Sequence, residues 1–436
     1  MKLGLVAMSG VRAENEALMR LGLTLPGFVS RSRVIAKLPS LGLLTLAGLT
    51  PRDVDVTYLE VDSLADIEGL PGEFDAVAIS SFSARIRDTY VLADRYRAAG
   101  CTVILGGLHV TARPQEALHH ADSVVLGEAE DAWPRLMADL ASGALRPVYD
   151  QRGQSYDLAR APMPRFDLLD PARYNRLTVQ TQRGCPLSCE FCASSIRLAP
   201  RFKTKPVEKV TAEIRRIKDI WPGPFIELAD DNTFANKAHA RRLVRAMAAE
   251  NVRWFTETDI SVADDDDLLS MLADAGCVQL LIGLEAPHRG ALDGLEQKAN
   301  WKAARADDYL EAIRRIQRKG ITVNGCFILG LDGQDGSSFE AVAAFVRESG
   351  LYEVQVTLQT PFPGTPLHDR LHAAGRLLRP DDWNSCTLFD VMFRPAKMSV
   401  EELETGFARL IAELYSDAAM ADRRSRYRRQ SVRCRA

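Results

Sequence analysis

The chain has 436 residues, a net charge of −3 at pH 7, 46% apolar residues and 26% charged residues. This length allows two or three domains with separate cores, and the composition is ordinary for a globular protein. No apolar run approaches the roughly 18 residues that a membrane-spanning helix needs, so we expect no transmembrane segment. The eight cysteines, three of them clustered, fit a reducing compartment better than a disulfide framework, which predicts a cytoplasmic protein.

Residues 1–150 alternate short β-rich runs with helical patterns, which predicts a Rossmann-like parallel sheet covered on both faces. The expected strands are 3–8, 54–61, 76–82, 102–106 and 123–126, and the expected helices are 41–49, 86–99, 114–119 and 131–142. Ligands of such sheets bind beyond the carboxyl ends of the strands. The residues singled out at these ends are Ser81, Gly106, Gly107, His109 and Glu128.

Residues 151–176 contain three prolines and no sustained period, which indicates a linker. From residue 177 a β-then-α pattern repeats six times, with strands expected at 177–183, 225–229, 254–258, 279–284, 322–329 and 353–359. Six units, not eight, predict a partial TIM-like (βα)6 barrel over residues 177–375, with its chemistry at the carboxyl ends of the strands.

Residues 376–436 form the last segment, for which one amphipathic helix is expected at 400–414. Its tail carries seven arginines after Ala421. A contact with nucleic acid or an anionic membrane is one interpretation of that tail. A frayed, solvated terminus is the interpretation we favour.

Cys185, Cys189 and Cys192 follow the first barrel strand at C-x3-C-x2-C spacing. Three thiolates on one tight loop can each hold one iron of a [4Fe–4S] cluster, which leaves the fourth iron without a protein ligand. The alternatives are a three-cysteine zinc site and reduced core cysteines. Structural zinc usually shows a second cysteine pair or histidines downstream, and no such pair follows here. The spacing therefore favours a cluster, with Phe191 as its shield.

The stretch 183–192 resembles the signature of the radical S-adenosylmethionine (SAM) superfamily. In that family the open iron binds the amino and carboxylate groups of SAM, and one electron splits SAM into methionine and a 5′-deoxyadenosyl radical. Residues 1–150, with stretches 39–44 and 106–111, resemble the cobalamin (B12)-binding domain that precedes the barrel in one branch of the superfamily. The resemblance implies cobalamin at the five strand-end residues named above.

One feature departs from the wider cobalamin family, because no histidine precedes His109. Many members supply a histidine after the first strand, so the resemblance implies a cobalt with no protein histidine beneath it. An empty, structural domain is the alternative.

Polar groups also follow the other barrel strands, and each alone could be a cap or a turn. Their coincidence at the cysteine face predicts a SAM site, in which a carboxylate faces the ammonium group. By resemblance, Asp230 and Asp231 occupy the place of the family's acidic motif, although the usual Gly-Gly-Glu is absent. Glu285 lies where members contact ribose or the methionine moiety, and Gly330 would admit adenine. Other expected SAM contacts are Glu257 and Asp259.

Residues 227–378 resemble the subgroup that contains the hopanoid methylases, and the branch also includes the anaerobic magnesium-protoporphyrin cyclase. The resemblance implies a cobalamin-dependent methyltransferase that acts on a carbon of a small metabolite, apolar or lipid-like. It also implies a flavodoxin- or ferredoxin-type electron donor and no nucleic-acid partner. Two alternatives stay open: a cobalamin-independent radical SAM dehydratase, cyclase, epimerase or oxidoreductase, and a non-catalytic iron–sulfur electron carrier.

The remaining cysteines are scattered and are predicted to be small buried hydrophobes. They are Cys101, Cys277, Cys326, Cys386 and Cys434. Three histidines near predicted strand ends could exchange protons with a substrate, although surface positions are the favoured interpretation. They are His288, His368 and His372.

Overall fold

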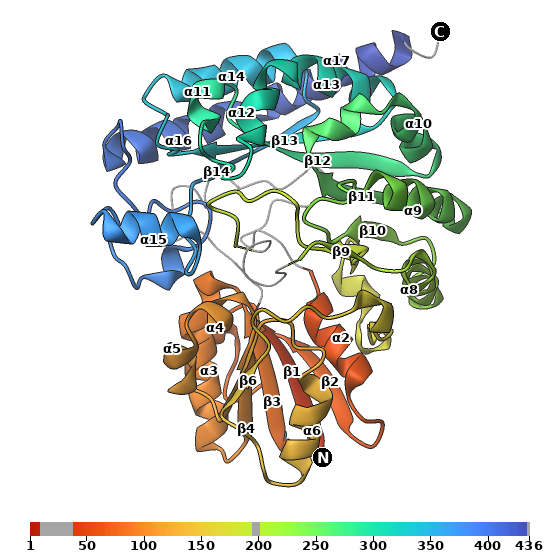
Figure 1. The fold of residues 1–436 in the computed structure, drawn as a ribbon, viewed down its shortest axis with the longest axis vertical. Helices are drawn as coiled ribbons and strands as arrows, with labels where there is room; N and C mark the ends of the chain where they lie inside the picture. Colours follow the sequence, from red (N-terminus) through yellow and green to blue (C-terminus); the bar gives the residue numbers. More distant parts are fainter. Residues whose placement is uncertain (9–37, 194–200, 434–436) are drawn as a thin grey trace.

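The computed structural model describes residues 1–8, 38–193 and 201–433, which form two parallel six-stranded sheets one above the other (Figure 1). The first sheet has the strand order β2-β1-β3-β4-β5-β6. Its strands are β1 (Lys2–Met8), β2 (Asp55–Glu60), β3 (Ala76–Ser81), β4 (Thr102–Gly106), β5 (Ser123–Leu126) and β6 (Val148–Asp150). The five predicted strands are confirmed to within one or two residues. The short edge strand β6 was not predicted, because only Tyr149 of its three residues is buried.

Helices cover both faces of this sheet, as predicted. They are α2 (Leu41–Leu49), α3 (Ile86–Ala98), α4 (Leu108–Ala112), α5 (Pro114–Leu118) and α6 (Trp133–Ala141). Side chains alternate along β1, so Val6 and Met8 pack in the core beneath α3 to α5, whereas Leu3, Leu5 and Ala7 pack in the core beneath α2 and α6. The sheet is therefore buried on both sides, and its carboxyl end is left for ligands.

The second sheet has the order β14-β13-β12-β11-β10-β7, with β7 and β14 at its two edges, which confirms the partial barrel. Its strands are β7 (Leu177–Val179), β10 (Phe225–Leu228), β11 (Arg253–Thr258), β12 (Cys277–Glu285), β13 (Thr322–Leu329) and β14 (Glu353–Leu358). The helices between them are α8 (Val207–Ile220), α9 (Lys237–Glu250), α10 (Asp266–Asp274), α11 (Arg289–Leu292), α12 (Trp301–Arg305), α13 (Tyr309–Arg318) and α14 (Ser338–Ser349).

The first barrel strand is shorter than predicted. β7 ends at Val179, and Gln182–Arg183 form a separate strand, β8, which pairs antiparallel with β9 (Lys203–Thr204). The cause is Asp230, whose carboxylate accepts hydrogen bonds from the backbone N–H groups of Thr181 and Gln182 at 2.7 and 3.0 Å. The backbone therefore leaves the sheet just before the cysteine loop begins.

Residues 151–176 contain three short 3-10 helices, η3 (Leu158–Arg160), η4 (Phe166–Leu168) and η5 (Pro171–Arg173). Phe166 is 1% exposed and packs in the barrel core. The segment thus connects the two sheets while it covers part of the barrel.

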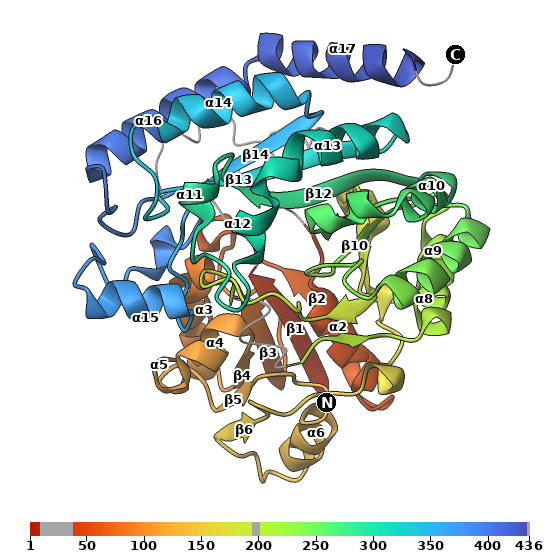
Figure 2. The same ribbon diagram turned by 45° about the horizontal axis from the view of Figure 1, so that its top comes forward.

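The C-terminal segment contains α15 (Pro366–Ala373), η8 (Trp383–Ser385), α16 (Val400–Leu414) and α17 (Asp417–Arg433). The expectation of a frayed basic tail was wrong, because α17 is a helix that lies along the outside of the barrel beside α14 (Figure 2). Arg423 is buried and donates to the carbonyl of Leu414 at 2.7 Å, and Arg424 forms an ion pair with Glu353 at 2.9 Å. Cys434 and Arg435 lie outside the described residues.

None of the helices in the described part of the chain combines the length and the apolar character that crossing a membrane requires.

Candidate functional site

The three clustered cysteines line one cavity of about 230 Å³ at the carboxyl ends of the barrel strands. Phe191 lines it with them, and other lining side chains follow β10 and β11 or belong to β12 and β13. The structure therefore brings the cysteine loop and the barrel's strand ends into one site, as the sequence predicts.

One side of the cysteine loop is held by the segment after β12. Leu295 accepts a backbone hydrogen bond from Glu190 at 3.0 Å. The carboxylate of Glu296 accepts from the backbone N–H groups of Ser188 at 3.1 Å and Ala299 at 2.8 Å. The pKa of Glu296 is lowered because these and two further N–H bonds outweigh the opposing effect of burial. Glu296 is thus an anchor of the loop that sequence reasoning did not identify.

The other side of the loop is held by α15. Arg370 forms two hydrogen bonds to the carboxylate of Glu190, at 2.7 and 3.0 Å, and a third to Asp332 at 2.6 Å. Phe191 packs against Leu367 in the small core beside α15. A bidentate arginine fixes orientation as well as distance, so α15 sets the position of the loop between Cys189 and Cys192.

The cysteine thiols must lose their protons before they can bind metal. Burial raises the pKa of Cys185, and it raises the pKa of Cys189 to about 12. The thiolate is the metal ligand, so cluster assembly here must release protons.

The three cysteines of the loop line the same cavity. Within the described residues, no three His, Cys, Asp or Glu side chains are placed to share one metal ion. In a cubane each of the three cysteines holds a different iron, so a cluster does not require the three sulfurs to share one ion.

Four of the predicted SAM-contacting carboxylates line the same cavity: Asp231, Glu257, Asp259 and Glu285. Asp231 accepts the backbone N–H of Gly184 at 3.0 Å, and Asp259 accepts the amide of Asn232 at 2.7 Å. Burial raises the pKa of Glu257 to about 8, and the nearby carboxylates add to the rise. A cationic ligand in this cavity would relieve that repulsion.

Asp230 lies outside this cavity, which corrects the expected role of this residue. Asp230 is 4% exposed, and besides the two backbone bonds that end β7 it accepts from the hydroxyl of Thr233 at 3.0 Å. Burial raises its pKa to about 6. Asp230 therefore shapes the start of the cysteine loop instead of facing a ligand.

Gly330 also lies elsewhere, beneath the C-terminal segment. A Cβ atom there would lie 3.1 Å from side-chain atoms of both Leu403 and Phe393, and its backbone has φ of +91°. Its N–H donates to the side chain of Gln334 at 2.8 Å. The structure accounts for the glycine by this close packing and its positive φ.

Three residues of the site were missed or misread from the sequence. Asn232 donates to the sulfur of Cys185 at 3.8 Å. Cys326, predicted to be a buried hydrophobe, is only half-buried and lines the cavity. Lys302, on α12, supplies the one cation among the described residues that line it. No motif marks Lys302, because it follows its strand by a connection without a recognisable pattern.

The burial predicted for the other cysteines and histidines is confirmed for most of them and wrong for one. Cys101, Cys277 and Cys386 are buried, as predicted, and Cys434 lies outside the described residues. His288 and His372 are exposed, as expected, whereas His368 is 3% exposed, which corrects its predicted surface position. His368 lies beside Trp383, with ring centroids 6.0 Å apart.

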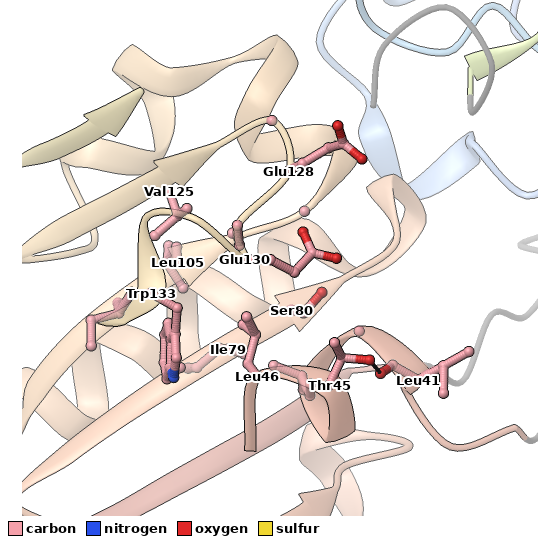
Figure 3. Close-up of a pocket in the computed structure, with 18 of the residues that line it drawn as sticks. Leu41, Thr45, Leu46, Ile79, Ser80, Leu105, Val125, Glu128, Glu130 and Trp133 are labelled. Carbon is pink, nitrogen blue, oxygen red and sulfur yellow. Dashed lines mark hydrogen bonds between the residues drawn. The ribbon is translucent and has the colours of Figure 1, made fainter. Parts of the chain in front are cut away.

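A second cavity of about 340 Å³ lies between the two sheets (Figure 3). Figure 3 shows its apolar side chains, among them Leu46, Leu105 and Trp133, together with the carboxylates of Glu128 and Glu130. Other lining residues come from the barrel and are Gln180, Arg183 and Ala229. The cavity therefore lies at the carboxyl end of the first sheet and opens toward the barrel.

Three of the five predicted cobalamin residues line this cavity: Gly106, Gly107 and Glu128. Gly107 has φ of +106°, and a Cβ atom there would lie 3.2 Å from the hydroxyl of Ser80, so a side chain at 107 would fill the cradle.

Ser81 and His109 do not line the cavity, which corrects both expectations. Its neighbour on β3, Ser80, lines the cavity instead of Ser81. His109 is 1% exposed and packs edge-on against Trp383 at 5.2 Å.

The two cavities adjoin at two places in the chain. Arg183 lines the second cavity, and Cys185, two residues later, lines the first. In the same way Ala229 lines the second cavity, and Asp231, two residues later, lines the first. Ion pairs cross the same junction, because Arg183 contacts Glu128 at 2.6 Å and Glu130 at 2.7 Å. Lys203 of β9 contacts Glu128 at 2.5 Å. The mouth of the first sheet is thus tied to the base of the cysteine loop.

Fold and site together define a two-domain α/β protein, in which a Rossmann-like domain faces the three-cysteine mouth of a partial barrel. Family models identify both parts. Residues 32–137 match the B12 binding domain, residues 179–346 match the radical SAM superfamily, and residues 365–434 match a domain of unknown function. The chain thus contains a B12 binding domain followed by a radical SAM domain, and these domains imply an enzyme that uses a [4Fe–4S] cluster, SAM and cobalamin.

Three known proteins illustrate the similarity. Bacteriochlorophyllide d C-12(1)-methyltransferase of Chlorobaculum tepidum is 27% identical over 88% of this chain and 84% of its own length. Hopanoid C-2 methylase of Rhodopseudomonas palustris is 27% identical over 81% of this chain and 68% of its own. The structure of the radical SAM methyltransferase TsrM of Kitasatospora setae, with cobalamin and a [4Fe–4S] cluster bound, has a TM-score of 0.67 at 14% identity and covers 96% of this chain and 89% of its own. That likeness confirms the two-domain fold.

Proposed function

We propose that this enzyme is a cobalamin-dependent methyltransferase that adds a methyl group to a carbon of a small, largely apolar molecule. The observation that carries the proposal is the junction of the two cavities at Arg183–Cys185 and Ala229–Asp231. A substrate carbon must be reached by both a radical and a methyl donor, so the two cofactor sites have to open on a common space. The relatives named for bacteriochlorophyllide d and hopanoid methylation support a methyl transfer to carbon and an apolar substrate.

The chain's own residues divide the work between the cavities. When bound, the cluster supplies the electron that splits SAM, and cobalamin supplies the methyl group. Cys185, Cys189 and Cys192 would hold the cluster, and Phe191 lines the cavity on the side of α15. Asp231, Glu257, Asp259 and Glu285 form the acidic wall that would bind the cationic ammonium of SAM.

The second cavity would hold cobalamin. Gly106 and Gly107 let a bulky ligand approach the backbone at the end of β4, and the apolar side chains behind them suit a flat, mostly apolar group. Glu128 forms part of the rim through its ion pairs to the barrel. The electron for the cluster would come from a flavodoxin- or ferredoxin-type donor.

The test is an anaerobic product assay on protein reconstituted with iron, sulfide and cobalamin, with a chemical reductant, SAM labelled in its methyl group, and a set of polycyclic hydrocarbon-like acceptors. We expect 5′-deoxyadenosine, S-adenosylhomocysteine and labelled product in equal amounts. Cys185→Ala should abolish all three. Cys277→Ala is the matched control, because Cys277 is a buried cysteine of the same barrel outside the cavity.

The same assay separates the competing functions. Deoxyadenosine formed with every acceptor but without S-adenosylhomocysteine would refute methyl transfer. Failure to retain cobalamin, with SAM cleavage intact, would favour a cobalamin-independent radical enzyme. An intact cluster that cleaves no SAM under strong reductant would favour an electron carrier.

A further inference from the structure

Lys302 and Glu285 form a buried ion pair in the wall of the cysteine cavity. The ammonium of Lys302 lies 2.7 Å from the carboxylate of Glu285 and donates to the carbonyl of Gly283 at 2.9 Å. Both side chains are 8% exposed. Burial opposes the charged form of Lys302, but the neighbouring charges of Glu285 and Cys189 more than offset it and raise the pKa of Lys302. The lysine is therefore a fixed cation inside the site.

The backbone at the end of β12 is distorted where it presents this pair. Glu285 has φ of +62°, a region that residues other than glycine rarely adopt, and the register with β13 shifts between Gly283 and Glu285. A Cβ atom on Gly283 would lie 2.5 Å from the carboxylate of Glu285 and 3.3 Å from the ammonium of Lys302. The strained backbone at Glu285 and the missing side chain at Gly283 thus leave room for the two charged groups.

Stability alone does not account for such a pair. Buried ion pairs are often no more stabilising than apolar side chains of the same size, because both charges lose their hydration. Backbone strain at Glu285 adds a further cost. What distinguishes this pair is its strained backbone and its position in the wall of the cysteine cavity, from which its charges can act on the site.

The partner that the geometry offers is Cys189. Lys302 and Cys189 line the same cavity. Four carboxylates line the cavity against this single cation of the described residues. A cation that favours a negative sulfur also favours an additional electron beside that sulfur, because both are the same electrostatic effect.

We infer that Lys302, held in place by Glu285, is a positioning residue that raises the reduction potential of the cluster at Cys189. The inference rests on the proposed [4Fe–4S] site. Reduction takes one electron from an external reductant and makes the site one charge more negative. Lys302 stabilises that added charge, and Glu285 opposes it while it orients the ammonium.

The experiment is a potentiometric titration of the reconstituted cluster, followed by electron paramagnetic resonance, without SAM or acceptor. Lys302→Met removes the charge at similar length and should lower the ratio of reduced to oxidised cluster about tenfold at a fixed potential, which is 59 mV for a one-electron couple. Lys302→Arg keeps the charge and should stay near the wild-type potential. Glu285→Gln removes the opposing charge and should shift the potential upward.

The matched control is Lys205→Met. Lys205 forms a similarly buried pair with Glu213 at 2.8 Å, with side chains 5% and 2% exposed, and lines no part of the cysteine cavity. Its potential should equal that of the wild type, so it separates a charge effect from a general loss of packing.

The result that overturns the inference is a fully loaded cluster whose potential is the same in Lys302→Met, or moves in the same direction in Lys302→Met and Glu285→Gln. An equal shift in Lys205→Met would overturn it as well. If Lys302→Met fails to hold a cluster, Glu285→Gln still tests the inference, because its cluster potential should shift upward. Wild-type protein that assembles no cluster would instead refute the proposed function, and iron and sulfide contents show which of the two has failed.

Discussion

Glu257 makes the stability of the barrel depend on pH. Its carboxyl group faces the cysteine cavity, and burial together with Glu227, Asp231 and Asp230 raises its pKa from 4.5 to about 8. In the unfolded chain the group loses its proton near its ordinary pKa. The folded state therefore holds one more proton than the unfolded state between about pH 4.5 and 8, and its stability falls as pH rises through that window.

The size of the effect follows from the two pKa values. One pKa unit corresponds to about 1.36 kcal/mol, so the full difference is on the order of 5 kcal/mol. Glu257 is partly exposed to a cavity that admits water, and this reduces the cost of its charge. We therefore expect roughly 2 kcal/mol, which is about 4–8 °C in melting temperature for a domain of this size.

The assay compares melting temperatures of wild type and Glu257→Gln at pH 5.5 and 8.5, without SAM, by near-ultraviolet circular dichroism. Glutamine is neutral at both pH values, so the variant should gain on the wild type as pH rises. Glu340→Gln, on the exposed face of α14, is the control, because the Glu340 side chain is 72% exposed. The reasoning fails if Glu257→Gln and wild type lose the same stability between the two pH values.

Three further predictions concern the supports of the two cavities. Asp230→Asn should destabilise the protein by ~1–3 kcal/mol, because the buried hydrogen bonds of Asp230 to the start of the cysteine loop are weakened. The SAM affinity of the cluster-loaded fraction should stay unchanged. Thermal melting measures the first effect and equilibrium binding the second. Arg370→Ala should release Glu190 and speed iron loss to a chelator several-fold, and unchanged kinetics would contradict the role of α15. Gly107→Leu should abolish cobalamin retention and leave iron content intact; equal retention would show that cobalamin binds elsewhere.

The order of elements was predictable because both halves repeat a simple pattern. Buried parallel strands give apolar runs and their helices give a 3.6-residue period, so every strand of the two sheets was found except the three-residue edge strand β6. The helix α17 was missed for the opposite reason. Arg423 and Arg424 lie on its buried side. Arginines at helical spacing do not count as apolar residues, so the pattern did not predict a packed helix.

The sequence predicted the parts of the candidate site whose residues lie close together along the chain. The cysteines lie within eight residues, so they had to share a loop. Asp230 and Asp231 are neighbours in sequence, but one binds the backbone at the end of β7 and the other faces the cavity. Ser80 and Ser81 are also neighbours in sequence, but only Ser80 lines the second cavity. Such choices depend on the local twist of the backbone, which side-chain type alone does not encode.

Lys302 shows a different limit. It reaches the cavity from α12, 17 residues beyond its partner Glu285, and the intervening segment has no period that predicts where the helix turns back. A sequence signal was nevertheless present at Gly283. A glycine two residues before a strand-end acid leaves room for a side chain from elsewhere, and here the ammonium of Lys302 fills that room.

The junction between the cavities bears on how the two cofactors meet. Arg183 and Cys185 are two residues apart, so their Cα atoms are separated by at most about 7 Å. The same holds for Ala229 and Asp231. A substrate at this junction can therefore touch both cavity walls without a large domain movement. The ion pairs of Glu128 and Glu130 with Arg183 hold the first domain against the barrel, and opening them would leave buried charges without partners, which is costly. We therefore expect both transfers to occur in the closed arrangement of the two domains.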